Sequence, residues 1–146
     1  MMDFFDALKT SASGLTAQRI RMNLISGNLA NANTTRTADG GPYRRKDLVV
    51  AAAAEGRSFA DVLRAQQEGG PVSVKPLAVV EDQRPPIRKY EPGHPDADDD
   101  GYVLLPNVNV TEEMVNLVSA SRSYEANIAA VKAAKSMAQR ALEIGK

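Results

Sequence analysis

The 146-residue sequence contains no cysteine and no tryptophan, and aromatic residues make up only 5% of it. The lack of cysteine excludes disulfides, thiolate metal sites and cysteine nucleophiles. The scarcity of aromatic residues argues against a core built on rings. Lysine plus arginine and aspartate plus glutamate number 18 each, so the formal net charge is zero. We therefore expect no strong electrostatic attraction to nucleic acid or to an anionic membrane surface.

Long apolar runs are also missing. Residues 48–54, LVVAAAA, form one of the longest, and they fall well short of the roughly 20 residues that span a bilayer. Asp3 and Asp6 stand where a secretory signal would carry basic residues, and no continuous apolar stretch follows them. We therefore expect no direct membrane insertion and no cleaved signal peptide.

What the sequence does contain is a heptad pattern at each end. In the first segment, one apolar residue recurs every seven positions, at Leu8, Leu15, Met22 and Leu29. The alternate positions of this seam are less regular and hold Phe5, Ala12, Arg19 and Ser26. This spacing predicts a helix with a coiled-coil type of seam.

The last segment repeats the pattern more clearly. Its seam follows the alternating three- and four-residue spacing of a heptad, through Met114, Leu117, Ser121, Tyr124, Ile128, Val131, Lys135, Ala138 and Leu142. Thr111 is the predicted N-cap, and Glu112 and Glu113 suit the first turn of the helix. A helix over residues 112–144 would be about 50 Å long.

Both helices also carry apolar residues away from these seams, such as Ile20 and Leu24 in the first and Val115 and Val118 in the last. A two-helix hairpin in water would have polar outer faces. The helices therefore need neighbours, which either an internal bundle or other subunits would supply. Because the middle segment offers no further long helix, we favour other subunits.

The middle of the chain is rich in glycine and proline and predicts a small β-rich domain with long loops. Short runs at 47–53, 72–82 and 102–106 indicate strands, and 58–67 is compatible with a short helix. Pro76 and the Pro85-Pro86 pair should interrupt a sheet or occupy its edges. We therefore predict an α+β fold with three parts: an N-terminal helix over 1–34, a β-rich domain over 35–106 and a C-terminal helix over 107–146.

The strongest chemical motif is an acidic run. Asp96, Asp98, Asp100 and Gly101 match the opening of an EF-hand calcium loop, in which alternating carboxylates converge on the ion. The twelfth loop position should be a glutamate but is Asn107, and the preceding prolines prevent an incoming helix. A solvated acidic turn is the favoured interpretation, and a calcium-binding surface module is the alternative.

Other candidate sites are weak. His94 is the only histidine, so a transition-metal site is poorly supported, and a hydrolase built on His94 is a second alternative. The basic cluster PYRRK, residues 42–46, could contact phosphate or an acidic partner surface, but it is too small to indicate nucleic-acid binding. We expect no catalytic residue, no bound metal and no cofactor.

Two long stretches resemble a known family. The sequence SGLTAQRIRMNLISGNLANANTTRT with GGPYRRK, and later YEPGHPDADDDGYVLLPNVNVTEEMVNLVSASRSYEANI, closely resemble the bacterial flagellar rod and hook axial proteins, in particular the proximal-rod component of the basal body. The resemblance covers residues 8–47 and 90–146. It implies a structural subunit that assembles helically with other rod proteins and transmits torque for motility.

The resemblance also implies partners and a location. In this family the terminal helices pair as a coiled coil lining the tube, and the β-rich middle faces outward. The implied partners are other proximal and distal rod proteins, neighbouring copies, the rod-base adaptor and the flagellar type III export apparatus. The implied location is the rod of the basal body in the periplasmic space, reached by export without a cleaved signal peptide.

The asparagine-rich stretch after the first helix fits this picture as a hinge. Asparagine amides at the end of a packed helix can form hydrogen bonds that fix register, as a buried polar residue does in a coiled coil. The following Thr residues favour turns. We predict a hinge motif between helix and surface domain, which acts between subunits, at Asn28, Asn31, Asn33, Thr34 and Thr35.

Overall fold

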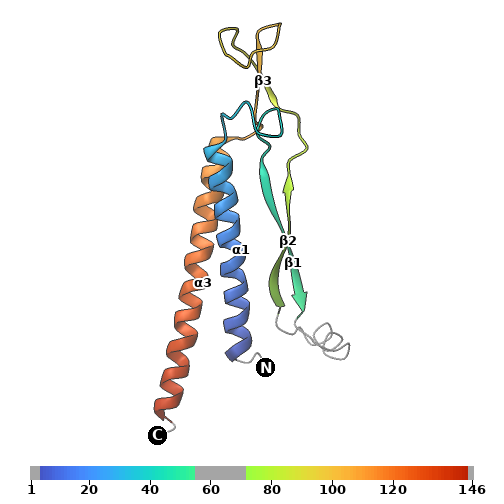
Figure 1. Ribbon diagram of the computed structural model, residues 1–146. Coiled ribbons are helices and arrows are strands. Elements are labelled where there is room, and N and C mark those ends of the chain that lie inside the picture. The colour runs from blue at the N-terminus through green and yellow to red at the C-terminus, as the bar shows by residue number, and fades with distance from the viewer. Residues whose placement is uncertain (1–3, 55–71, 145–146) are drawn as a thin grey trace. The chain divides into compact units, whose positions relative to one another are not determined.

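The computed structural model describes residues 4–54 and 72–144. Its elements follow the order α1 (Phe4–Ala30), β1 (Lys46–Ala54), β2 (Val72–Glu81), β3 (Ile87–Tyr90), β4 (Tyr102–Leu105) and α3 (Val110–Ile144) (Figure 1). Strand β1 pairs with β2, and β3 pairs with β4. This confirms the predicted α+β class with long helices toward both ends and small sheets between them. No helix within the described ranges is both long and apolar enough to cross a membrane.

The strands lie close to their predicted positions, with one addition. The runs predicted at 47–53, 72–82 and 102–106 form β1, β2 and β4. Strand β3 was not predicted, because its four residues, IRKY, lack a clear apolar alternation and directly follow the proline pair. Pro76 lies inside β2, where it is tolerated because each strand of a two-stranded sheet is an edge strand. The short helix predicted at 58–67 lies outside the described residues.

The chain divides into two compact units, and α1, α3, β1 and β2 each contribute to both. The first unit comprises the described residues of Met1–Ile20, Val49–Ala78 and Ala120–Lys146. In this unit α1 and α3 approach closely at Gly14, where an added Cβ would lie 3.0 Å from the amide nitrogen of Asn127. A glycine at this position therefore makes room for the Asn127 side chain against the backbone of α1.

A serine joins α1 to the sheet in the first unit. The Ser13 hydroxyl donates to the carbonyl of Thr10 at 2.7 Å and accepts from the amide of Val74 in β2 at 3.0 Å. Because β2 has few buried side chains, this hydrogen bond is an important contact between helix and strand.

The second unit comprises Arg21–Leu48 and Val79–Ser119. It contains the hairpin of β3 and β4, in which Tyr90 pairs with Tyr102 and their rings meet edge to face at 5.3 Å. Val103, on the other face of this hairpin, is almost fully buried. The largest fully buried side chains of the described chain all belong to this unit: Glu113, Val103, Asn28 and Pro106. Two of these four are polar, so the centre of the unit is held by more than apolar packing.

Burial along α3 reveals a seam close to the predicted one. Side chains recurring every seven residues are buried or half-buried on two lines. One line, Leu117, Tyr124, Val131 and Ala138, belongs to the predicted seam, and the other is Glu113, Ala120, Asn127 and Ala134. This second line lies one residue before the predicted Met114, Ser121, Ile128 and Lys135. Hydropathy favours Met114 over Glu113, but the small or polar side chains of the observed line suit a close approach of α1.

Burial along α1 is equally periodic. The predicted seam residues Leu8, Leu15, Met22 and Leu29 are all half-buried. The alternate positions form part of an exposed stripe along the helix, which holds Phe5, Ala12, Arg19 and Ser26. Arg19 and Ser26 interrupt the apolar pattern of the sequence. Their polar side chains fit these positions because this face of α1 is in contact with solvent in the single chain.

Candidate functional site: the polar junction

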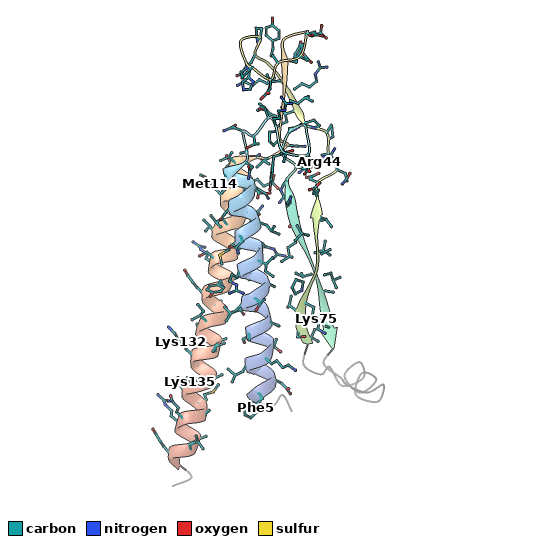
Figure 2. All side chains as sticks on the ribbon, in the orientation of Figure 1. Phe5, Arg44, Lys75, Met114, Lys132 and Lys135 are labelled. Atoms are coloured by element: carbon teal, nitrogen blue, oxygen red, sulfur yellow. The ribbon has the colours of Figure 1, made fainter. Side chains whose placement is uncertain are left out.

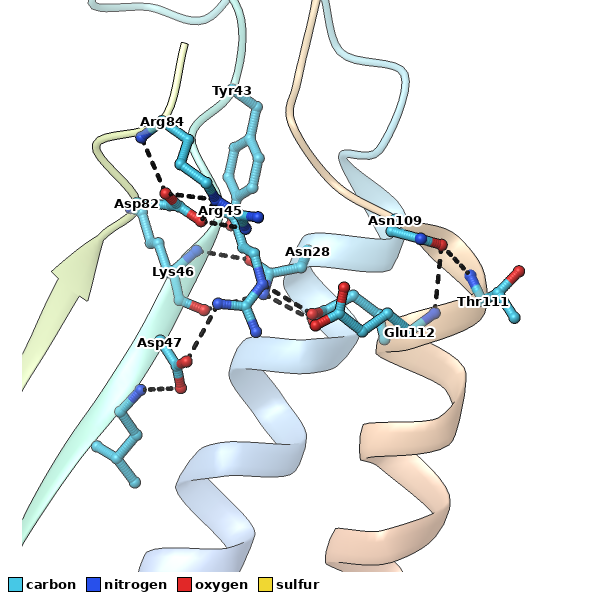
Figure 3. A network of polar contacts seen from close by, with 12 residues as sticks. Asn28, Tyr43, Arg45, Lys46, Asp47, Asp82, Arg84, Asn109, Thr111 and Glu112 are labelled. Carbon is cyan, nitrogen blue, oxygen red and sulfur yellow. Dashed lines mark hydrogen bonds and ion pairs between the residues drawn. The ribbon is translucent and has the colours of Figure 1, made fainter. Parts of the chain in front are cut away.

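Asn28, in the last turns of α1, is the centre of a buried network in the second unit (Figure 3). Its side chain is 0% exposed. The amide nitrogen donates to the carbonyl of Lys46 and to Oε2 of Glu113, both at 2.9 Å. The amide oxygen accepts from the Lys46 amide at 2.9 Å and from the Tyr43 hydroxyl at 3.0 Å. All four hydrogen-bonding positions of this side chain are therefore used.

The bonds to Lys46 have a particular geometry. Asn28 contacts both the N–H and the C=O of one residue, which is how a neighbouring strand residue pairs in an antiparallel ladder. Lys46 is the first residue of β1. The Asn28 amide thus replaces a strand partner and fixes where β1 begins.

Glu113 links the same network to α3. Its carboxylate is 1% exposed, and it accepts from Asn28 on Oε2 and from Nε of Arg45 on Oε1 at 2.8 Å. Arg45 also donates to Asp47 at 3.1 Å. A buried carboxylate is costly unless it is paired and hydrogen-bonded, and here both oxygens have partners. We call Asn28, Tyr43, Arg45, Lys46 and Glu113 the polar junction.

Contacts within the polar junction shift the pKa values of two of its ionisable groups. Burial would lower the pKa of Arg45, but hydrogen bonds to Glu113 and Asp47 outweigh this and raise the pKa above its usual value. Burial raises the pKa of the Tyr43 hydroxyl, and the nearby carboxylates of Glu81 and Glu113 raise it further. Arg45 therefore stays charged and Tyr43 stays a hydrogen-bond donor across the neutral pH range.

The remaining residues of the predicted hinge motif end α1. The Asn31 amide donates to the carbonyl of Gly27 at 2.9 Å, and its oxygen accepts from the Thr34 hydroxyl at 3.2 Å. The first of these bonds adds to the hydrogen bond that the Asn31 backbone amide donates to the same carbonyl at 3.1 Å. The Thr35 hydroxyl donates to Asp96 at 2.7 Å, and Asn33 is exposed. Asn28 and Asn31 thus have partners within their own chain, and a role between subunits stays a prediction.

Helix α3 begins with a different cap from the predicted one. The side-chain oxygen of Asn109 accepts from the amides of Thr111 at 3.0 Å and Glu112 at 3.3 Å, so Asn109 is the N-cap (Figure 3). The prediction of Thr111 was wrong by two residues, because asparagine and threonine are both good caps and the sequence offers both. Starting the helix at Val110 places Glu113 in its first turns, within reach of Asn28.

The acidic run forms a turn between β3 and β4. Asp98 accepts from the amides of Asp100 at 3.1 Å and Tyr102 at 2.7 Å, and it lies 3.6 Å from Arg88. Gly101 adopts a positive φ of 79°. The described residues contain no group of three or more acidic, histidine or cysteine side chains placed to hold a metal. Calcium binding therefore gains no support.

His94 lies in the same loop and is half-buried rather than fully exposed. Its Nδ1 accepts from the amide of Asp96 at 3.1 Å. The hollow beside it is lined by Glu91, Gly93, His94 and Pro95, and this lining includes no serine, threonine or cysteine for the histidine to activate. This environment gives the ring a structural partner and no support for a hydrolase.

The predicted seam residues differ in exposure. Leu117, Tyr124, Ile128 and Val131 are half-buried in the single chain. Met114 is 56% exposed and Leu142 is 74% exposed. Figure 2 shows Met114, Lys132 and Lys135 projecting from the surface of α3. Whether the exposed members contact other subunits stays a prediction.

Sequence reasoning found Asn28 but missed its partners. Glu113 was interpreted only as a first-turn acid, and Tyr43 and Arg45 only as part of a basic cluster. An acid in heptad register with Ala120 and Ala134 was the available signal, because a buried carboxylate requires a cation nearby.

Two family models match this chain. Residues 99–144 match the family model described as "Flagellar basal body rod FlgEFG protein C-terminal", and residues 8–36 match "Flagella basal body rod protein". A relative from Bacillus subtilis, "Flagellar basal-body rod protein FlgC", is 46% identical over 99% of this chain and 100% of its own length. Proteins of the same name from Borreliella burgdorferi and Salmonella typhimurium are each 43% identical, over 98% and 99% of this chain and 98% of their own lengths.

Proposed function

Because this chain belongs to the FlgC family of flagellar basal-body rod proteins, it is a structural subunit of the bacterial flagellar rod, and we propose that its terminal helices pair as a coiled coil within that assembly. It is a structural protein and not an enzyme, and its work in motility is mechanical. The chain resides in the flagellar basal body and assembles there with other rod components.

Contacts between α1 and α3 support the coiled coil. In the first unit, Gly14 lies against Asn127, and in the second unit Asn28 bonds to Glu113. The two-line burial of α3 has the seven-residue period of a coiled-coil seam. Exposed Met114, Val118 and Leu142 are then available to neighbouring subunits. A repeated contact that does not close produces a helical tube, as a rod requires.

The polar junction is the main support for the proposed hinge. It joins the end of α1, the start of β1 and the start of α3 through five residues, with every hydrogen-bonding position of Asn28 filled. Such a network has one geometry in which all its members are satisfied, so it fixes how the strand leaves the helix pair. In this proposal the helical parts, 1–34 and 107–146, form the tube, and 35–106 forms the outer domain.

The proposal also includes specific partners and a specific location. They are the proximal and distal rod proteins, neighbouring copies, the rod-base adaptor and the type III export apparatus, with the rod crossing the periplasmic space.

A substitution in the half-buried line of α3 tests the assembly. In the bacterium that encodes this chain, Leu117→Asp should abolish swimming and the recovery of basal bodies with rods, because it places a charge in the helix seam. The conservative Leu117→Met should support both. Normal swimming with Leu117→Asp would contradict the coiled-coil role.

A second substitution tests the action of the hinge between subunits. Asn31→Leu removes the side-chain amide that bonds to Gly27 and Thr34, and it should reduce rod assembly more than Asn33→Leu, which changes an exposed neighbour. Rods that form equally well with Asn31→Leu would argue against this role.

A further inference from the structure

The second unit has a hollow of about 250 Å³ that is rich in arginine. Three arginines line it, Arg44, Arg45 and Arg84, together with a single carboxylate, Asp82. We call it the arginine hollow. Arg45 is paired with Glu113, and Arg84 donates to Asp82 at 2.8 Å. The remaining cation, Arg44, is exposed and forms no ion pair or hydrogen bond with any residue that the structure describes (Figure 2).

The turn between β3 and β4 carries negative charges that have no partner among the described residues. The other aspartates of this turn are engaged, since Asp96 accepts from Thr35 and Asp98 organises the turn. The carboxylates of Asp99 and Asp100 are exposed and have no partner among the described residues. We call these two residues the acidic tip.

The acidic tip has a fixed position in its own chain. Asp98 holds the backbone amides of Asp100 and Tyr102, and Gly101 packs so closely that an added Cβ would lie 2.9 Å from the Tyr90 ring. Neither residue of the tip lines the arginine hollow. The turn therefore does not pair either carboxylate with Arg44 of the same molecule.

We propose that the acidic tip of one copy docks in the arginine hollow of a second copy, where Asp99 and Asp100 neutralise Arg44. Arg45 and Arg84 already have carboxylate partners, so the hollow has one uncompensated positive charge, on Arg44, and the exposed carboxylates of the tip have the opposite sign.

This contact joins two different surfaces of the same chain. Such a heterologous contact leaves a free tip on one copy and a free hollow on the other, so it can repeat without closing. The inference rests on the proposed assembly into a rod, and it assigns one contact between copies within that assembly.

Charge reversal in the encoding bacterium tests the pairing. Arg44→Asp alone, or Asp99→Arg with Asp100→Arg, should each reduce the number of rods recovered by about fivefold, the effect of replacing an exposed attraction with a repulsion. Arg44→Asp combined with Asp99→Arg and Asp100→Arg should restore rods, because every copy then carries both reversed surfaces. The matched reversals Arg36→Asp and Asp39→Arg change exposed charges of the same unit outside the hollow and should have little effect.

Cross-linking distinguishes a second copy from another rod protein. The chain has no cysteine, so a copy with Arg44→Cys and a copy with Asp99→Cys can be co-expressed and joined by a short thiol-specific cross-linker. A dimer from this pair, absent with Arg36→Cys in place of Arg44→Cys, is the expected result. Rods that assemble and give no such dimer, or cross-link Asp99→Cys only to a different protein, would overturn the proposal while leaving the rod function intact.

Discussion

The side-chain amide of Asn28 donates a 2.9 Å hydrogen bond to the carboxylate of Glu113, a residue 85 positions later in the chain. Both side chains are buried, and the bond joins the end of α1 to the beginning of α3. Since Asn28 also pairs with the first residue of β1, one amide sets the relation of three segments. Substitutions here should therefore affect all three together.

Asn28→Asp should lower the free energy of unfolding by about 3 kcal/mol. The new carboxylate cannot donate to Lys46 or Glu113, and it places a second buried negative charge beside Glu113. Asn23→Asp makes the same change on an exposed position of α1 and should shift stability by less than about 0.5 kcal/mol. Urea unfolding followed by circular dichroism measures both, and equal midpoints for the two variants would contradict the role of Asn28.

Glu113→Ala should be more damaging than Glu112→Ala, although the two residues are adjacent and identical in type. Loss of Glu113 removes one acceptor from the half-buried Arg45 guanidinium, which keeps only Asp47, and one from the Asn28 amide, which keeps only the Lys46 carbonyl, at a cost of about 3 kcal/mol. Glu112 is exposed at the N-terminus of α3, and its loss removes only about 0.5 kcal/mol of favourable interaction with the helix dipole. Thermal unfolding compares them, and a larger loss with Glu112→Ala would exclude this account.

Gly101→Ala should destabilise the hairpin of β3 and β4 by about 2 kcal/mol. Gly101 has a φ of +79°, which disfavours alanine, and the new Cβ would approach Tyr90 and Pro92 within 3.1 Å. Gly93→Ala, in the same loop, meets nothing within 4 Å and lacks a positive φ, so it should be tolerated. Hydrogen exchange of the Tyr102 amide reports on the hairpin, and unchanged protection with Gly101→Ala would refute the prediction.

Asp82 should titrate well below its usual pKa. Hydrogen bonds from the Arg84 side chain and backbone lower the pKa of Asp82 from 3.8 to about 2. The depressed value means that the ionised form favours the folded chain. This contribution is therefore present above about pH 3.8 and is lost as the pH falls through about 2. Nuclear magnetic resonance titration should show the pKa returning toward 3.8 with Arg84→Gln and remaining near 2 with Arg88→Gln.

The burial of the heptad positions shows which seam residues a sequence pattern can identify. Leu8, Leu15, Met22 and Leu29 were identified as one line of the seam, and all are half-buried. On α3 the pattern selected Met114, while the most buried residue nearby is Glu113. Hydropathy could not prefer an acid over a methionine, because the cation and amide that compensate Glu113 come from Arg45 and Asn28, far away in the sequence.

The hinge motif also combines contacts that the sequence can predict with contacts that it cannot. The sequence marked Asn28, Asn31 and the two following threonines as the place where the helix ends and a turn begins, and the Asn31 side chain does form local bonds there, to Gly27 and Thr34. Asn28 differs because its partners lie 18 and 85 positions away. Local capping is encoded by neighbouring residues and can be predicted from them, whereas the partners of a buried amide depend on which segments meet in space.

By itself the sequence determined the helices at both ends, the strands between them and the resemblance to flagellar rod proteins, because backbone propensities and heptad spacing act over a few neighbouring residues. Only the tertiary structure decided that a carboxylate and an amide occupy the most buried positions of the second unit, and that Asn28 pairs with the start of β1. A buried polar group is stable only when its partners are brought to it by the fold. For that reason its role could not be assigned before the fold was known.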